Sequence, residues 1–366
     1  RGSTYNSYLI KDEKNILIDT VWLPYAQEFI NELEKIINPA ELDAIIVTHA
    51  EPDHSGALPN LVHRKPGIPV YCSKSALKSI SGYYHKDFNF QVVKTGDKIN
   101  IGKREITFIE APFLHWPDTM MCHLGGDGIL FSSDVFGQHF ASANLNASAN
   151  DKSILLYEAL KYYANIIAPF SDKVTKKINA LKEMNLEINM ICPAHGLIWD
   201  ANPDEIINLY EKWADSYAEN QVTIIYDTMY NSTRAMAESI AAGIADAANQ
   251  PVVRVFNLAN TDKSDILAEI FRSKGIIIGS PTHNNGVLSS VAGLLEEIEG
   301  MELKGKTGGA FGSYGWAEKA VKKISESLLK SGLDVPIEGI ACQWAPDEST
   351  LSRCFEFGKN FSGSIK

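Results

Sequence analysis

Imidazole and carboxylate side chains gather in the stretch 48–56, where His49, Glu51, Asp53 and His54 lie within six residues. The stretch follows the apolar run 44–47, which predicts a buried strand that ends in a loop. Alternate side chains of an extended segment point the same way, so the first three can converge, with His54 beside them. Burying such a cluster is costly unless a positive ion lies between its members. The sequence therefore predicts a metal site, and the alternative is a solvated loop.

Three later residues of ligand type, His115, Asp134 and His195, each follow a predicted strand. With the first cluster they make four imidazoles and three carboxylates, more than one metal needs. Two metals that share a bridging carboxylate would use them all, at a separation of about 3.5–4 Å. Mixed imidazole and carboxylate ligation without thiolate favours iron, manganese or zinc. Four other histidines do not fit this set and are interpreted as surface or core residues: His63, His85, His123 and His139.

A second cluster of interest lies between the apolar run 222–226 and a predicted helix from about 233 to 248. A loop rich in hydroxyls at a helix N-terminus predicts an anion site, because backbone N–H groups and the helix dipole can hold a phosphate. The loop lacks the Gly-x-Gly-x-x-Gly pattern of dinucleotide sites. The alternative is an ordinary capped helix. The candidate residues are Thr228, Met229, Tyr230, Asn231, Ser232 and Thr233.

Two further loops follow the third and fourth predicted strands of the same region. Ligands of such sheets bind at the carboxyl ends of the strands. The amide and aromatic groups of these loops suit the isoalloxazine ring of a flavin, although Trp316 could instead pack on its loop as a partly exposed aromatic. The candidates are Pro281, Thr282, His283, Asn284, Asn285 and Gly286 in one loop, and Ser313, Tyr314, Gly315 and Trp316 in the other.

The elements that position these residues differ between the two parts of the chain. Residues 1–220 read as strands, short turns and helices, with a hairpin over 8–19 and helices near 25–37, 153–165, 173–184 and 204–220. Residues 221–366 alternate strand and helix five times, which predicts a doubly wound parallel sheet. A length of 366 residues suits two domains. We therefore predict domains at 1–220 and 221–366.

Composition excludes several classes of protein. The net charge is −11, and no basic run interleaves with aromatic residues, which argues against nucleic acid and anionic membrane surfaces as partners. No apolar stretch approaches the length of a membrane span. Five scattered cysteines without Cys-x-x-Cys argue against a disulfide framework and against an iron–sulfur or rubredoxin centre. A reducing cytoplasm is the expected compartment.

The joint pattern resembles a known family. A His-x-Glu-x-Asp-His motif after a strand, with later His115, Asp134 and His195, resembles the metallo-β-lactamase-like fold. Hydrolases of that superfamily typically have histidine where Glu51 stands. Glu51 in that position, followed by a flavodoxin-like domain, resembles the flavodiiron proteins (A-type flavoproteins), and within them the rubredoxin:oxygen oxidoreductases. The resemblance extends over essentially the whole chain, although the chain begins where that family usually has some preceding strands, so the front edge of the first sheet is expected to be incomplete.

The resemblance implies an αββα first domain in which two irons lie on either side of Asp134. It assigns one iron to His49, Glu51 and His115, and the other to Asp53, His54 and His195. It also implies FMN in the second domain beside Trp316, an external electron donor such as rubredoxin, and a head-to-tail homodimer or dimer of dimers. The expected reaction reduces O2 to water or NO to N2O. A two-electron flavin and two ferrous ions together hold the four electrons that O2 needs.

Two other interpretations fit parts of the pattern. A dinuclear zinc hydrolase could be fused to a flavodoxin-like domain without flavin, but Glu51 and the loop with Asn284 and Asn285 argue against it. A pure electron carrier could keep a decayed first domain, but the complete ligand set argues against that. The sequence does not separate O2 from NO, because both would use the same ligands.

Overall fold

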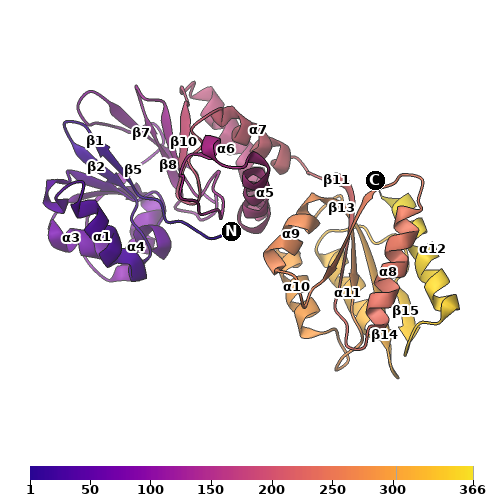
Figure 1. Cartoon of the computed structure of the whole chain (residues 1–366). Helices are drawn as coiled ribbons and strands as arrows, with labels where there is room; N and C mark the ends of the chain where they lie inside the picture. Colours follow the sequence, from indigo (N-terminus) through magenta and orange to yellow (C-terminus); the bar gives the residue numbers. More distant parts are fainter. Residues whose placement is uncertain (302, 366) are drawn as a thin grey trace. The chain divides into compact units, whose positions relative to one another are not determined.

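A computed structural model describes residues 1–301 and 303–365, which form two compact units, Arg1–Asp215 and Ser216–Lys366 (Figure 1). The expected helix over 204–220 is shorter in the structure, since α7 ends at Ala214. Ser216 has a φ of +49°, a left-handed conformation that a helix cannot contain. Asn220, near which the domain boundary was placed, lies in strand β11 (Glu219–Tyr226).

The first unit contains two five-stranded sheets. In the first sheet the order is β1-β2-β3-β4-β5, and in the second it is β10-β9-β8-β7-β6. The predicted hairpin is confirmed, because β1 and β2 pair antiparallel. The strands are β1 (Tyr8–Lys11), β2 (Asn15–Ile18), β3 (Ala44–Ile46), β4 (Pro69–Ser73), β5 (Asn89–Val93), β6 (Lys98–Asn100), β7 (Glu105–Glu110), β8 (Met120–Leu124), β9 (Ile129–Ser133) and β10 (Met190–Pro193).

Helices cover the outer faces of this sandwich, so the expected αββα arrangement is confirmed (Figure 1). Ile16 and Ile18 of one sheet pack against Phe108 and Phe131 of the other in a buried core between the sheets. A second core joins Leu17 and Ile45 to the helices outside the first sheet. The helices are α1 (Ala26–Glu34), α2 (Pro52–Ser55), α3 (Leu58–Arg64), α4 (Lys74–Tyr84), α5 (Lys152–Tyr162), α6 (Ser171–Glu183) and α7 (Pro203–Ala214).

The second unit is a parallel sheet with helices on both faces, as predicted. Its order, β12-β11-β13-β14-β15, is that of a flavodoxin-like fold. Strand β14 is longer than expected and includes Ser313 and Tyr314, because it pairs with β15 as far as Gln343. The remaining elements are β12 (Val252–Asn257), β13 (Ser273–Gly279), β14 (Thr307–Tyr314), β15 (Ile340–Gln343), α8 (Ser232–Ala245), α9 (Lys263–Arg272), α10 (Ser289–Glu299), α11 (Ala320–Lys330) and α12 (Glu348–Ser364).

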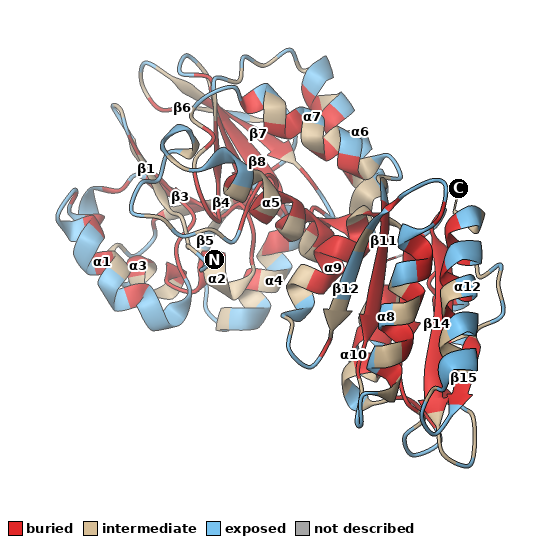
Figure 2. Ribbon diagram, turned by 45° about the vertical axis from the view of Figure 1, so that its right-hand side comes forward, coloured by how far each residue is buried: buried red, intermediate tan, exposed pale blue. Residues whose placement is uncertain are grey.

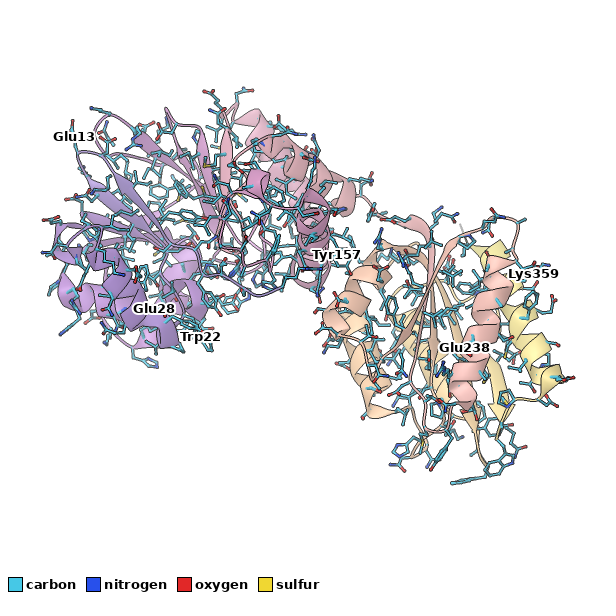
Figure 3. The ribbon with its side chains drawn as sticks, viewed as in Figure 1. Glu13, Trp22, Glu28, Tyr157, Glu238 and Lys359 are labelled. Atoms are coloured by element: carbon cyan, nitrogen blue, oxygen red, sulfur yellow. The ribbon has the colours of Figure 1, made fainter. Side chains whose placement is uncertain are left out.

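Figure 2 shows buried strands between helices whose outer faces are exposed. Glu238 of α8 and Lys359 of α12 project from such outer faces (Figure 3). Within the described residues, no helix is long and apolar enough to cross a membrane.

Helices α8 and α12 cross at two glycines. A Cβ at Gly243 would lie 1.9 Å from the Phe355 carbonyl oxygen, and one at Gly358 would lie 2.1 Å from the Ile240 carbonyl oxygen. Backbone therefore packs on backbone at this crossing. Helix α8 begins directly after the loop 227–231. Because α12 packs closely on α8, its position also affects where that loop lies.

We predict that Gly358→Ala destabilises the second unit by about 1–3 kcal/mol, because the added methyl group forces the two backbones apart. The denaturant midpoint of the second unit measures the effect. Gly363→Ala, on the exposed side of the same helix with no atom within 4 Å of the added carbon, is the matched control. It should leave the midpoint unchanged or raise it. Equal midpoints for the two variants would contradict this view of the crossing.

Candidate metal centre and flavin pocket

All seven predicted metal ligands lie at one edge of the sandwich in the first unit. The loop after β3 carries His49 and Glu51, and α2 carries Asp53 and His54. The other three follow β7, β9 and β10. The Met120 backbone N–H donates to the Thr48 carbonyl at 2.8 Å, which joins the two sheets at this edge.

One group of four side chains surrounds a common point. Glu51 Oε2 lies 3.1 Å from His49 Nε2 and 3.3 Å from His115 Nε2. Asp134 Oδ2 lies 3.3 Å from His115 Nε2 and 3.6 Å from His49 Nε2. Two imidazole nitrogens and two carboxylate oxygens can thus bind one ion.

The other oxygen of Asp134 faces a second group. Asp134 Oδ1 lies 3.1 Å from His54 Nε2 and 3.2 Å from His195 Nε2. Asp53 Oδ2 lies 3.2 Å from His195 Nε2. One buried carboxylate therefore presents one oxygen to each group, which is the geometry of a bridging ligand between two metals.

The polar atoms at this position show that a metal fits. Both carboxylate oxygens of Asp134, Oδ1 of Asp53 and Nε2 of His54 are buried and make no hydrogen bond, although imidazole nitrogens and carboxylate oxygens face one another at 3.1–3.6 Å. Burying such atoms without hydrogen bonds is costly, and cations between the two groups would satisfy them. The side chains are not equally covered, because Asp134 is 1% exposed whereas Glu51 is 32% and Asp53 is 25% exposed. Solvent reaches the centre from the side of Glu51 and Asp53.

The electrostatics of the cluster favour positive charge. Burial acts to lower the pKa of His49, but hydrogen bonds to Asp118 and Glu51 outweigh it and raise that pKa to about 10. Burial acts to raise the pKa of Asp134, but the surrounding imidazoles outweigh it and hold that pKa well below its usual range. Protons and metal ions compete for the same nitrogen lone pairs, so this field also favours metal ions.

The structure adds partners that the sequence did not indicate. His49 Nδ1 lies 3.0 Å from Asp118 Oδ2, an oxygen that also accepts the Ala50 backbone N–H at 2.6 Å. His195 Nδ1 lies 2.6 Å from the Thr4 carbonyl oxygen. Such partners fix a ring so that its Nε2 lone pair faces the metal. His54 is held less tightly, with its Nδ1 4.0 Å from an Asp19 oxygen.

The four other histidines of the first unit stay outside the two groups. His63, His85 and His139 are exposed, and the His123 ring nitrogen pairs with the Glu187 carbonyl at 2.7 Å. The His139 ring is near the centre, 5.9 Å from the His195 ring between centroids, but it belongs to neither group.

A cavity of about 500 Å³ lies at the carboxyl ends of the strands in the second unit. Its volume suits a cofactor. Thr228 Oγ1 is buried there without a partner, which suits an anionic group at the N-terminus of α8. Thirteen residues of the predicted set line the cavity: Thr228, Met229, Tyr230, Ser232, Pro281, Thr282, His283, Asn284, Asn285, Ser313, Tyr314, Gly315 and Trp316.

Three residues of the predicted flavin set do not line this cavity. Asn231 directly precedes α8 and has a left-handed backbone conformation. Thr233 is buried, and its hydroxyl lies 3.2 Å from the Ser313 hydroxyl. Gly286 pairs with His283 in an isolated bridge. Ala317 and Trp344 complete the lining without having been predicted.

Comparison with known proteins agrees with this arrangement. Residues 4–196 match the model of the ODP family beta lactamase, and residues 224–358 match flavodoxin. The anaerobic nitric oxide reductase flavorubredoxin of Escherichia coli is 45% identical over 364 residues, covering 99% of this chain and 76% of that protein. The protein of the same name from Aliivibrio fischeri is 47% identical, covering 98% of this chain and 73% of that protein.

Solved structures extend the likeness. The rubredoxin oxygen:oxidoreductase of Desulfovibrio gigas superposes with a TM-score of 0.95 at 34% identity, covering 99% of this chain and 91% of that one. The flavodiiron protein of Giardia intestinalis superposes with a TM-score of 0.94 at 30% identity, covering 99% of this chain and 89% of that one. This chain belongs to the flavodiiron protein family. As a member of that family it carries both expected domains, the β-lactamase-like and the flavodoxin-like.

We predict that Asp118→Asn weakens metal binding at the position of His49, Glu51 and His115 by about 10–100-fold, because the His49 ring loses the carboxylate that orients it. Anaerobic titration of the metal-free protein with ferrous ion measures the affinity. Asp127→Asn is the control, because Asp127 pairs with Arg104 on the surface of the same unit. Equal affinities in the two variants would show that Asp118 does not orient the ligand.

Proposed function

We propose that this flavodiiron protein reduces NO to N2O and O2 to water at two irons, with electrons delivered through FMN. The single observation that carries the proposal is Asp134, whose two buried oxygens face separate groups of imidazole and carboxylate ligands. One group, His49, Glu51 and His115, is proposed to hold one iron. The other, Asp53, His54 and His195, is proposed to hold the second, with Asp134 as the bridge.

When bound, the irons bind and polarise the oxidant, and the flavin supplies electrons. The residues of the chain hold this chemistry in place. Three negative carboxylates, Glu51, Asp53 and Asp134, offset most of the positive charge of two divalent ions. The buried His49 and Asp134 keep water from the inner side of the centre, while the partly exposed Glu51 and Asp53 mark the side from which the substrate enters.

FMN is proposed to occupy the cavity in the second unit. The order of the strands reverses between β11 and β13, which is where ligands bind in such sheets. The N-terminus of α8 with Thr228 and Ser232 suits the phosphate, and the loops with Asn284 and Trp316 suit the ring. A single phosphate agrees with the absence of a dinucleotide motif.

An external rubredoxin is the proposed electron donor. Relatives named flavorubredoxin and rubredoxin oxygen:oxidoreductase support this choice. The cytoplasm is the proposed location, which agrees with five cysteines that are all unpaired.

A head-to-tail homodimer is proposed because both redox sites lie beside exposed apolar side chains. Near the metal centre, Trp22 (labelled in Figure 3) and Tyr25 are exposed. The Tyr5 ring lies between them and the site, with its centroid 6.4 Å from that of Trp22, 5.8 Å from that of Tyr25 and 5.9 Å from that of His195. At the flavin cavity, Trp316 is 89% exposed. Exposed apolar patches of this kind mark interaction surfaces. Two-fold closure would bury both pairs of patches and bring the flavin of each chain to the irons of the other.

Metal and flavin content test the proposed function. We expect about two irons and one FMN per chain after anaerobic preparation, with NO and O2 consumed under reducing conditions. Asp134→Ala should lose both irons, because its carboxylate belongs to both groups. His63→Ala, an exposed histidine of the same unit, should lose neither. Zinc alone with hydrolase activity, or equal iron content in wild type and Asp134→Ala, would contradict the proposal.

Mixing two inactive variants tests the dimer. One is Asp134→Ala, and the other is Ser232→Asp, which places a carboxylate where the phosphate would bind. If the sites are shared across chains, subunit exchange creates one intact flavin–iron pair in each mixed dimer, and part of the reductase activity returns. No recovery, with exchange demonstrated by differently tagged chains, would favour electron transfer within one chain.

A further inference from the structure

The segment Thr4–Tyr8 runs along the loop that carries His195 and is bonded to nearly every residue of it. The Asn6 backbone N–H donates to the Ala194 carbonyl at 2.8 Å. The Asn6 side-chain amide donates to the carbonyls of Pro193 and Gly196, each at 2.9 Å. The Tyr8 hydroxyl also donates to Pro193, at 2.7 Å.

Thr4 extends this contact to His195, the candidate metal ligand. Its hydroxyl oxygen accepts the Gly196 N–H at 2.6 Å, and its carbonyl oxygen lies 2.6 Å from His195 Nδ1. A carbonyl can only accept, so Nδ1 must carry the proton, and Nε2 then presents its lone pair to the second metal position.

The opposite side of the His195 loop is held by Gln138. Its side chain accepts the Leu197 N–H at 2.5 Å and donates to the Leu197 carbonyl at 3.0 Å. A Cβ at Gly196 would lie 1.7 Å from the Gln138 amide oxygen, so the loop has no room to move that way. The segment Thr4–Tyr8 therefore supports one side of the loop, and Gln138 supports the other.

The two metal positions differ in what orients their histidines. His49 is oriented by the carboxylate of Asp118, a charged partner within the fold that also raises the basicity of the imidazole. His195 is oriented by a neutral backbone carbonyl of Thr4, a half-buried residue outside any strand. Charged partners give stronger hydrogen bonds than neutral ones, so His49 is held more strongly than His195, while the nearest carboxylate to His54 Nδ1, that of Asp19, lies 4.0 Å away.

We propose that Asn6 and Thr4 are positioning residues for the second metal position alone, and that this position fills after the first. The proposal rests on the proposed function, because it requires two metals on either side of Asp134. Asn6 fixes the segment on the Pro193–Gly196 turn, and the fixed segment holds the Thr4 carbonyl against His195. Loosening the segment should therefore weaken the binding of one metal and leave the binding of the other unchanged.

The test is an anaerobic titration of the metal-free protein with ⁵⁷Fe²⁺, with the two irons resolved by Mössbauer spectroscopy. Wild type should take up two irons, in two steps. Asn6→Ala should bind the first as wild type does and the second about 10–100-fold more weakly. Asp118→Asn is the reciprocal variant and should weaken binding of the iron at the position of His49. Asn89→Ala removes the side-chain hydrogen bonds of Asn89 to the Gly67 carbonyl and from the Gln91 amide, elsewhere in the unit, and should match wild type.

The outcomes separate this proposal from the proposed function. If wild type binds two irons and Asn6→Ala keeps both, or loses both equally, the role of the segment is wrong while the function stands. If wild type itself does not bind two irons, the proposed function fails, and this proposal fails with it. Should Asn6→Ala not fold, Thr4→Val removes only the bond to the Gly196 N–H and should weaken the same iron to a smaller extent.

Discussion

The structure of the first unit depends on keeping one carboxylate buried. Asp134 follows β9 and is surrounded by four imidazoles rather than by arginine, lysine or solvent. A buried charge of this kind is tolerated only when it is paired. Its partners come from loops after strands of both sheets, so the sandwich must close correctly before the charge is compensated. Folding and formation of the site are therefore coupled, and metal binding would add to the stability of the folded unit.

The cavity of the second unit suits an anionic ligand although it offers no cationic side chain, neither lysine nor arginine, among the described lining residues. Backbone N–H groups at the start of α8 and the buried hydroxyl of Thr228 would provide the polar contacts instead. The glycine crossing of α8 and α12 then matters for function, because it sets where those groups lie. Exposed Trp316 and Trp344 leave the mouth of the cavity apolar, which suits a flavin that must exchange electrons with a partner.

Much of this could be predicted from the sequence, because the ligands directly follow apolar strands. Periodicity placed β3, β7, β9 and β10 closely enough to predict that His49, His115, Asp134 and His195 share one edge. The alternation after residue 221 likewise predicted the parallel sheet. The local sequence pattern was sufficient to predict a site residue wherever its position is set by the strand that directly precedes it.

The supporting contacts could not be predicted, since they join residues far apart in the chain. The Thr4 carbonyl is a backbone group and has no signature in sequence. Gln138 and Asn6 are ordinary polar residues whose roles arise only from the loop they meet. Asp118 left a weak signal, a carboxylate three residues after a candidate ligand. Trp344 was missed because a lone aromatic after the last strand fits no pattern, and β14 was predicted too short because its last residues pair with β15.

The central claim is that Asp134 lies between two irons, and anomalous diffraction at the iron edge from crystals of the iron-loaded protein tests it most directly. We expect two peaks about 3.5–4 Å apart, one on each side of Asp134. One should lie among His49, Glu51 and His115, and the other among Asp53, His54 and His195. A single peak, or two peaks that both lie on one side of Asp134, would contradict the account.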